Sequence, residues 1–198
     1  MKNVKTIYSL KELHDVLESH TDLKRLILFL DLDLTLIRAT HDDKDELIEP
    51  EVTKKMFDFL HANNVWYLFL TARFHDILCV EKKRKEYLNQ MKENIENLYP
   101  IFEQIGVDCS HFKNNKNEHL EVIKNEKNKT IGIMYKGILL GDKKGEIIKH
   151  FRLKYGLDKT HPHTMFADDL DRYLKNVRKH VPNCFVFRRL IPDEYSSE

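Results

Sequence analysis

The sequence predicts an α/β fold, a doubly wound parallel sheet with helices on both faces. Two apolar runs, 26–30 and 65–70, show no alternation of polar and apolar residues, which is typical of strands buried on both faces. An amphipathic helical pattern that begins at Pro50 lies between them. A strand–helix–strand unit of this length favours parallel pairing with a right-handed crossover.

The rest of the first half is predicted to consist of helices and loops. A helical pattern follows Ser9, whose hydroxyl is suited to the N-cap position. Residues 38–49 are polar and acidic, and we expect them to form a loop. The pattern is helical again over 76–105, with Pro100 ending or kinking the helix.

The second half of the chain returns to strands. Residues 113–129 are crowded with Asn, Lys and Glu, which indicates an exposed helix or a flexible surface. Residues 130–141 predict a hairpin that turns at Lys136–Gly137. We then expect a helix at 145–155, a strand at 164–167, a helix at about 170–179, a strand at 184–187, and a solvated tail that starts at Arg188 and Arg189.

The composition is that of one globular domain. The chain has 198 residues, a formal net charge of +1 and 41% hydrophobic residues, which is enough for a sizeable core. We expect a single domain over 1–198, with 74–141 as a helical and hairpin insert. Because basic and acidic residues balance, there is no electrostatic footprint of a nucleic-acid partner, and none is expected.

Cysteine usage and the absence of apolar segments bear on location. The three cysteines, Cys79, Cys109 and Cys184, are odd in number and widely spaced, which indicates free thiols in a reducing compartment. No signal-peptide pattern follows Met1, and no apolar run approaches the roughly 20 residues that cross a bilayer. We expect no membrane span and a cytoplasmic location, with export lacking a cleavable signal left open. The polar ending also leaves open that the chain is the N-terminal part of a longer protein.

Acidic residues follow two of the predicted strands. Asp31 and Asp33 are spaced i and i+2 after the first apolar run, so they point to the same side and share one small volume. Such crowding predicts a metal ion, a perturbed carboxyl group, or both. Asp168 and Asp169 end a later strand and, together with Asp31, predict an oxygen-rich octahedral site of the kind Mg²⁺ prefers. We expect Asp169 to bind the metal directly and Asp168 to bind it directly or through water.

Other polar residues stand at strand and helix ends. Thr71 ends the second apolar run, where a hydroxyl and backbone N–H groups can bind a phosphate oxygen. Arg73 is a candidate phosphate or substrate contact, with a surface arginine as the alternative. Lys143 and Lys144 precede a predicted helix, and either can offset negative charge at the site.

These motifs resemble those of the haloacid dehalogenase (HAD) superfamily, in the superfamily's order and over residues 24–190. The matching segments are Asp31-Leu32-Asp33-Leu34-Thr35, Leu70-Thr71-Ala72, Lys144-Gly145 and Asp168-Asp169. The resemblance implies a HAD-like fold and phosphatase chemistry. Asp31 is then the nucleophile that forms an aspartyl-phosphate, and Asp33 the general acid and base, with its backbone carbonyl a metal ligand beside the aspartates 31, 168 and 169. Thr71 then holds a phosphate oxygen. Lys144 binds the phosphoryl group and offsets the charge between it and the nucleophile, and the resemblance favours Lys144 over Lys143 because a Lys-Gly pair opens the helix in related members.

The predicted loops leave room for only a small cap, or for none. An open site suits a phosphate presented on a macromolecule, because small metabolites usually need a lid that excludes water. The layout also resembles a poorly characterised HAD subgroup from intracellular bacteria, some of whose members are secreted into host cells. That resemblance implies a phosphoprotein substrate, with phosphotyrosine favoured. The alternatives are a phosphatase of small metabolites or of nucleic-acid ends, and a non-catalytic binding module.

Overall fold

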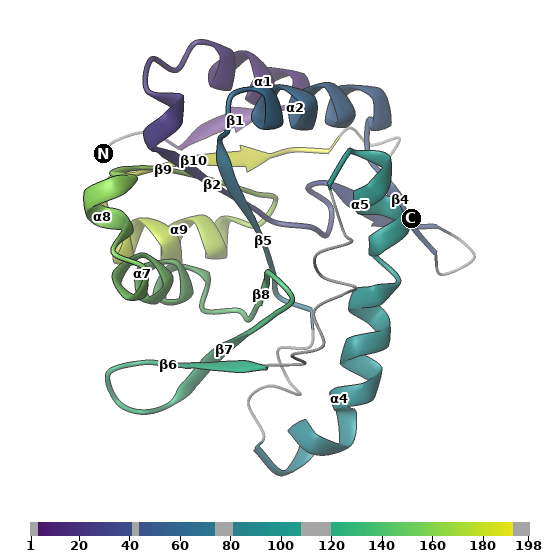
Figure 1. Ribbon diagram of the computed structural model, residues 1–198, viewed down its shortest axis with the longest axis vertical. Helices are drawn as coiled ribbons and strands as arrows, with labels where there is room; N and C mark the ends of the chain where they lie inside the picture. Colours follow the sequence, from purple (N-terminus) through teal and green to yellow (C-terminus); the bar gives the residue numbers. More distant parts are fainter. Residues whose placement is uncertain (1–3, 41–43, 74–80, 108–119, 192–198) are drawn as a thin grey trace.

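The computed structural model describes residues 4–40, 44–73, 81–107 and 120–191 (Figure 1). Its centre is an eight-stranded sheet in the order β1-β10-β9-β2-β5-β8-β7-β6. In this order, neighbouring strands pair in parallel as far as β8, whereas β7 pairs antiparallel with β8 and β6 pairs antiparallel with β7. The strands are β1 Lys5–Ile7, β2 Leu26–Leu30, β5 Trp66–Thr71, β6 Glu121–Lys124, β7 Thr130–Tyr135, β8 Ile138–Leu140, β9 His163–Asp168 and β10 Cys184–Arg189. The predicted α/β class is confirmed.

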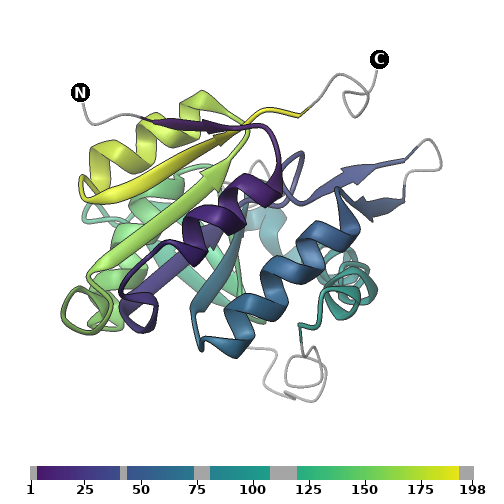
Figure 2. The same ribbon diagram turned by 90° about the horizontal axis from the view of Figure 1, so that it is seen from above.

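Helices cover both faces of this sheet (Figures 1 and 2). They are α1 Leu10–Glu18, α2 Pro50–Ala62, α4 Glu81–Glu96, α5 Tyr99–Gln104, α7 Lys144–Lys154, α8 Leu157–Thr160 and α9 Asp171–His180. In β2, Leu28 packs into the core cluster that contains α1 and α2, whereas its neighbours Ile27 and Phe29 pack into the cluster that contains α7 and α9. Alternate side chains of one strand therefore fill two separate cores, which explains why the run has no polar positions.

The order of the strands creates a switch point beside β2. The chain moves outward from β2 to β5 and β8, and then returns across the sheet to β9 and β10 on the other side of β2. Connections at the carboxyl ends of β2 and β9 therefore leave in opposite directions. The two ends stay close, since the amide of Asp31 donates to the carbonyl of Ala167 at 3.0 Å. Open α/β sheets bind their ligands at such points.

Several local predictions are confirmed. The Ser9 hydroxyl accepts the amide N–H of Glu12 at 3.3 Å and caps α1. Helix α2 begins at Pro50, whose missing N–H costs nothing in the first turn. Lys136 and Gly137 both have positive φ, 48° and 80°, as a two-residue hairpin turn between β7 and β8 requires.

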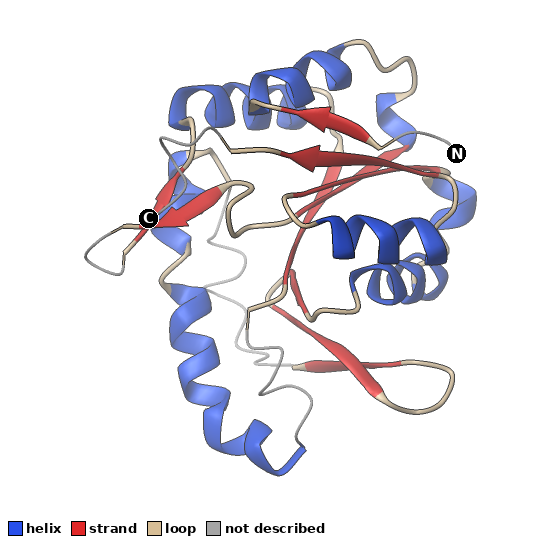
Figure 3. Cartoon of the chain, turned by 180° about the vertical axis from the view of Figure 1, so that it is seen from behind, coloured by secondary structure: helices blue, strands red, loops and turns tan. Residues whose placement is uncertain are grey.

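Other segments differ from the prediction. Residues 38–49 are not all loop, because β3 (Ile37–Ala39) and β4 (Asp45–Leu47) form a separate two-stranded antiparallel sheet (Figure 3). Each strand has three residues, too few to produce a recognisable alternation. Strand β6 falls in the segment expected to be an exposed helix or flexible surface, of which 113–119 lie outside the described residues.

The predicted long helix is two helices, and only part of it is described. Residues 76–80 lie outside the described ranges. Helix α4 ends at Glu96 and α5 begins at Tyr99, with Pro100 in its first turn. Pro100 therefore starts a new helix instead of ending the first one, as its locked φ and missing N–H allow at this position.

A buried ion pair joins three elements near the carboxyl edge of the sheet. Arg189 belongs to β10 and is 1% exposed, so the predicted solvated tail does not begin at Arg188 and Arg189. Its Nη2 lies 3.1 Å from Oε1 of Glu49, whose Oε2 accepts the amide N–H of Leu10 at 2.7 Å. Glu49 precedes α2 and takes a left-handed conformation with φ 49°. One carboxylate thus joins β10, α1 and α2.

Membrane-spanning helices and cysteine thiols are the two features of the described residues that bear on the sequence expectations about location. No helix within the described ranges is both long and apolar enough to cross a membrane. Cys184 is a free thiol, and burial raises the pKa of that thiol. Cys79 and Cys109 lie outside the described residues.

We predict that Glu49→Gln lowers the free energy of unfolding by about 3 kcal/mol, because it leaves the Arg189 charge buried without its counter-ion. The control is Glu51→Gln, at an exposed position of the first turn of α2. Urea unfolding of both variants checks this. Equal stability of the two variants would contradict the prediction.

Candidate metal centre

Three carboxylates meet at the switch point. Asp31 directly follows β2, Asp168 is the last residue of β9, and Asp169 follows it. One carboxylate oxygen from each lies within 4.8 Å of the others, with Asp31 and Asp168 buried and Asp169 partly exposed. The structure therefore brings together the three acids that the sequence predicts to share a metal.

A buried lysine lies against this acidic triad, Asp31, Asp168 and Asp169. The ammonium group of Lys144 is fully buried, pairs with Oδ1 of Asp31, and lies 2.6 Å from Oδ2 of Asp168. Its Nζ also lies 4.3 Å from the centroid of the Tyr173 ring, a favourable cation–π distance. Lys143, the alternative, is exposed at the start of α7. It is Lys144 that the fold places at the acids.

Close packing of two helices positions Lys144. Gly145 follows it in the first turn of α7, and its N–H donates to Oδ1 of Asn176 on α9 at 2.7 Å. A Cβ at position 145 would lie 2.3 Å from the backbone oxygen of Asn176. Only glycine permits this approach. Sequence reasoning identified the Lys-Gly pair but missed Asn176, because nothing in its local sequence indicates a helix cap on another element.

The charges in this cluster do not balance. Three ionised carboxylates and one ammonium would leave a net charge of −2 in a mostly buried volume, which is costly. Burial raises the pKa of Asp31 and of Asp168, although the Lys144 charge opposes the shift. Burial, followed by the Asp31 charge, raises the pKa of Asp169 to about 6. The triad therefore favours binding either protons or a cation.

A divalent metal ion fits this donor set. All three groups present carboxylate oxygens, which are the preferred ligands of hard cations such as Mg²⁺, Ca²⁺ and Mn²⁺. The excess negative charge supplies the electrostatic reason for binding. The donor set does not discriminate among these ions.

Asp33 has a different set of partners from Asp31. The Thr71 hydroxyl donates to Oδ2 of Asp33 at 3.0 Å and accepts the Arg73 amide N–H at 3.0 Å. The Arg73 guanidinium donates to Oδ1 of Asp33 through Nε at 2.8 Å and Nη2 at 2.6 Å. Thr71 and Arg73 therefore lie beside the Asp33 carboxylate, and the Thr71 hydroxyl both donates and accepts a hydrogen bond there.

Arg73 also contacts an acid that the sequence did not single out. Its guanidinium pairs with Asp45 on β4 at 2.7–2.8 Å. Burial would lower the pKa of Arg73, but the hydrogen bonds that Arg73 donates to Asp45 and Asp33, together with their negative charges, outweigh burial and raise that pKa. Arg73 is thus a bridge between two carboxylates, not a surface residue. Asp45 stands in an acidic run, and only the hairpin of β3 and β4 brings it to Arg73.

The first acidic loop contributes two further side chains. Thr35 is buried, and its hydroxyl donates to Oδ2 of Asp31 at 3.2 Å. Leu34, with φ 57°, is 39% exposed, as is Leu170 in the loop after the other acid pair. Apolar side chains are therefore exposed on both loops that hold the triad.

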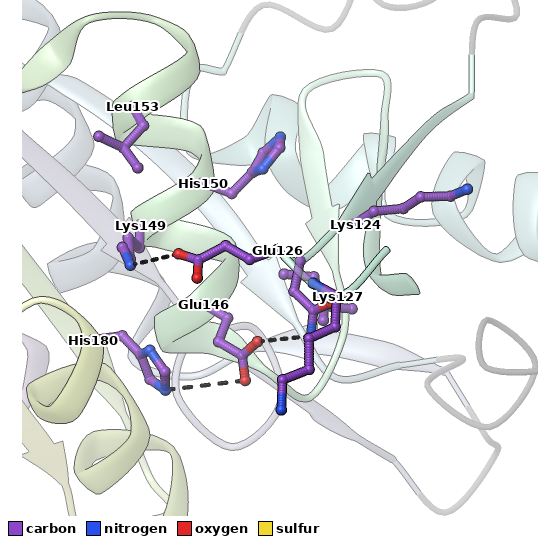
Figure 4. Close-up of a pocket in the computed structure, with 10 residues that line it drawn as sticks. Lys124, Glu126, Lys127, Glu146, Lys149, His150, Leu153 and His180 are labelled. Atoms are coloured by element: carbon purple, nitrogen blue, oxygen red, sulfur yellow. Dashed lines mark hydrogen bonds and ion pairs between the residues drawn. The ribbon is translucent and has the colours of Figure 1, made fainter. Parts of the chain in front are cut away.

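A separate cavity of about 360 Å³ lies between α7, the end of α9 and the turn after β6 (Figure 4). Its carboxylates already have partners: Glu126 lies 3.3 Å from Lys149, and Glu146 lies 3.4 Å from Asn125 and 4.0 Å from His180. No predicted site residue lines it. The pocket is therefore distinct from the acidic triad.

We predict that Gly145→Ala lowers the free energy of unfolding by about 1–3 kcal/mol, because the new methyl group overlaps the α9 backbone. It should also weaken metal binding, since Lys144 moves with the first turn of α7. Chemical unfolding and Mg²⁺ titration check both effects. Lys143→Ala, at the exposed neighbouring position, is the control, and an equal loss there would contradict the prediction.

We predict that Mg²⁺ raises the melting temperature more at pH 8 than at pH 5. An acid whose pKa is raised on folding holds its proton more tightly in the folded state. Stability without metal therefore falls as pH rises from about 4, the unfolded value, through the folded pKa of Asp169, about 6. Mg²⁺ supplies the positive charge that the lost protons provided. The rise in melting temperature that Mg²⁺ causes therefore grows over the same pH range.

Thermal melts with Mg²⁺ and with a chelator, at both pH values, check this pH dependence of the Mg²⁺ effect. Asp169→Asn should reduce the Mg²⁺ effect, whereas Asp171→Asn, an exposed acid of the next helix, should not. A Mg²⁺ effect that is independent of pH, or equal in the two variants, would refute the prediction.

Comparison with models of known protein families, with curated proteins and with solved structures finds no match to this chain. The function must therefore be inferred from its own residues and their geometry.

Proposed function

We propose that this chain is a Mg²⁺-dependent phosphomonoester hydrolase of the HAD type, acting through an aspartyl-phosphate. The observation that supports it most is the buried Lys144, paired with Asp31 and Asp168 beside Asp169 at the switch point. A purely structural role would not require three carboxylates around one ammonium. Membership of the HAD superfamily, as one domain over 1–198 with an insert at 74–141, is part of the proposal.

The first step is attack by Asp31 on the phosphorus. A bond forms between a carboxylate oxygen and phosphorus, and the ester P–O bond breaks. Lys144 offsets the repulsion between two anions, and Thr35 holds the second carboxylate oxygen. Asp33 gives its proton to the departing oxygen.

The second step is hydrolysis of the aspartyl-phosphate. Asp33 accepts a proton from the attacking water, which releases inorganic phosphate and restores Asp31. Thr71 and Arg73, both hydrogen-bonded to Asp33, are the proposed phosphate contacts. For Asp33 to exchange protons, the Arg73 guanidinium must shift part of its hydrogen bonding from Asp33 to the phosphoryl group.

Oxygens of the acidic triad, together with the backbone carbonyl of Asp33, are the proposed ligands of Mg²⁺. A bound Mg²⁺ neutralises charge on the phosphoryl oxygens and on the nucleophile. The raised pKa of each triad acid supports this role, because it reflects an unmet need for positive charge.

The proposed substrate is a phosphoprotein, with phosphotyrosine favoured. Leu34 and Leu170 support an aryl leaving group, because each exposes apolar surface on a loop that holds the triad. The small hairpin of β3 and β4 supports an open site, which admits a macromolecule. The proposed location is the cytoplasm, as the cysteine usage suggests, or a host cell reached by secretion, as the resemblance to the HAD subgroup implies.

A non-catalytic phosphate-binding module is the second candidate. The hydrogen bonds that Arg73 and Thr71 make to Asp33 favour it, since they engage the groups that would serve the chemistry. A phosphatase of small metabolites or of nucleic-acid ends would use the same residues with a different leaving group.

We predict Mg²⁺-dependent hydrolysis of para-nitrophenyl phosphate. Asp31→Asn should abolish turnover, and Asp33→Asn should lower kcat by about 10²–10⁴-fold, the usual value of general acid–base help. Asp171→Asn is the matched control. Release of para-nitrophenol, with and without chelator, is the measurement.

Two results would contradict the phosphatase. Full turnover in Asp31→Asn would exclude Asp31 as the nucleophile. Absence of turnover on this ester and on a panel of phosphopeptides, metabolites and nucleic-acid ends, with Mg²⁺ binding intact, would favour the binding module.

A further inference from the structure

We propose that Asp45 is a positioning residue of this site: it holds Arg73 against Asp33 and thereby fixes the β3–β4 hairpin as one wall of the site. The proposal rests on the function proposed above. It adds a residue outside the recognised motifs and assigns the hairpin a part in substrate selection.

The contact between Asp45 and Arg73 is bidentate. Nη1 donates to Oδ2 at 2.8 Å and Nη2 donates to Oδ1 at 2.7 Å, so two parallel hydrogen bonds join a planar guanidinium to a planar carboxylate. This geometry is the strongest that an arginine and a carboxylate form, and it also fixes their relative orientation. The Arg73 side chain cannot rotate without breaking both bonds.

The opposite side of the guanidinium is joined to the site. Nε and Nη2 donate to Oδ1 of Asp33 at 2.8 Å and 2.6 Å. The Asp45 and Arg73 side chains are only 20% and 22% exposed, whereas Asp33 is 44% exposed. The contact of Arg73 with Asp45 is therefore better shielded from water than its contact with Asp33.

This bridge is an ion pair between the hairpin and the loop after β5. Figure 2 shows the hairpin projecting beyond the carboxyl edge of the parallel strands. Within the hairpin, Arg38 pairs with Glu46. Among the ion pairs of the described residues, Arg73–Asp45 is the one that joins the hairpin to the loop after β5.

Substrate selection follows from this placement. A small aryl phosphate needs the triad, Lys144, Asp33 and the proposed phosphate contacts Thr71 and Arg73, but it does not extend as far as the hairpin. A phosphopeptide extends further and must pass the hairpin beside Asp33. Loss of the bridge leaves Arg73 with one carboxylate partner and removes the ion pair that holds the hairpin to the loop after β5. Binding of the extended substrate should therefore weaken more than binding of the small one.

The test compares Asp45→Asn and Arg73→Lys with Glu46→Gln, which breaks an ion pair inside the hairpin without touching Arg73. Hydrogen exchange is the readout that does not depend on catalysis. Amides of 37–40 and 44–47 should exchange about tenfold faster or more in the first two variants than in the control. In Asp45→Asn, KM should rise at least about fivefold more for a phosphotyrosyl peptide than for para-nitrophenyl phosphate, which corresponds to a difference near 1 kcal/mol.

The outcomes separate this inference from the proposed function. Faster exchange in Asp45→Asn and Arg73→Lys, with a selective rise in KM, supports the inference. Exchange equal to wild type, or raised equally in Glu46→Gln, overturns it even when the enzyme is active. Equal KM changes for both substrates overturn the selection role. An inactive wild-type protein contradicts the phosphatase and its substrate selection, while exchange still decides whether Asp45 holds the hairpin.

Discussion

The ion pairs of Lys144 with Asp31 and Asp168 are the interaction on which the site depends. A parallel sheet delivers the ends of β2 and β9 to the same edge, and here both ends are acidic. Without a cation between them, burial and mutual repulsion would oppose closure of the two strand ends. Lys144 supplies that cation from α7, and the close packing of Gly145 on Asn176 of α9 holds it there. The helix layer and the acidic triad are therefore coupled.

Two acids that are only two residues apart take different partners. Asp31 lies inside the triad, where Lys144 and Thr35 hold its two oxygens. Asp33 is more exposed and lies against Thr71 and the Arg73–Asp45 bridge. The same edge of the sheet thus contains a buried carboxylate in a cluster with excess negative charge, which suits a metal ion, and a more exposed carboxylate that is ion-paired with Arg73. Different environments give chemically similar residues different properties.

A second buried ion pair stabilises the fold without serving the triad. Glu49 joins Arg189 of β10 to the start of α1 and precedes α2. Its left-handed conformation costs free energy, which the ion pair and the hydrogen bond offset. Charge is therefore buried at two places near the same edge: in the ion pair that joins β10 to α1 and α2, and in the acidic triad with Lys144.

The sequence by itself determined the fold class, the strand ends and the residues of the triad. Unbroken apolar runs such as 26–30 identify buried parallel strands because both faces must be apolar, and the polar residues that end them must then meet at one edge. Tertiary structure alone decided that Lys144 and not Lys143 lies at the acids, that Arg189 is buried, and that Asp45 reaches Arg73. Each of these contacts joins residues far apart in the chain, and short strands such as β3 and β4 have too few residues for their pairing to be encoded locally.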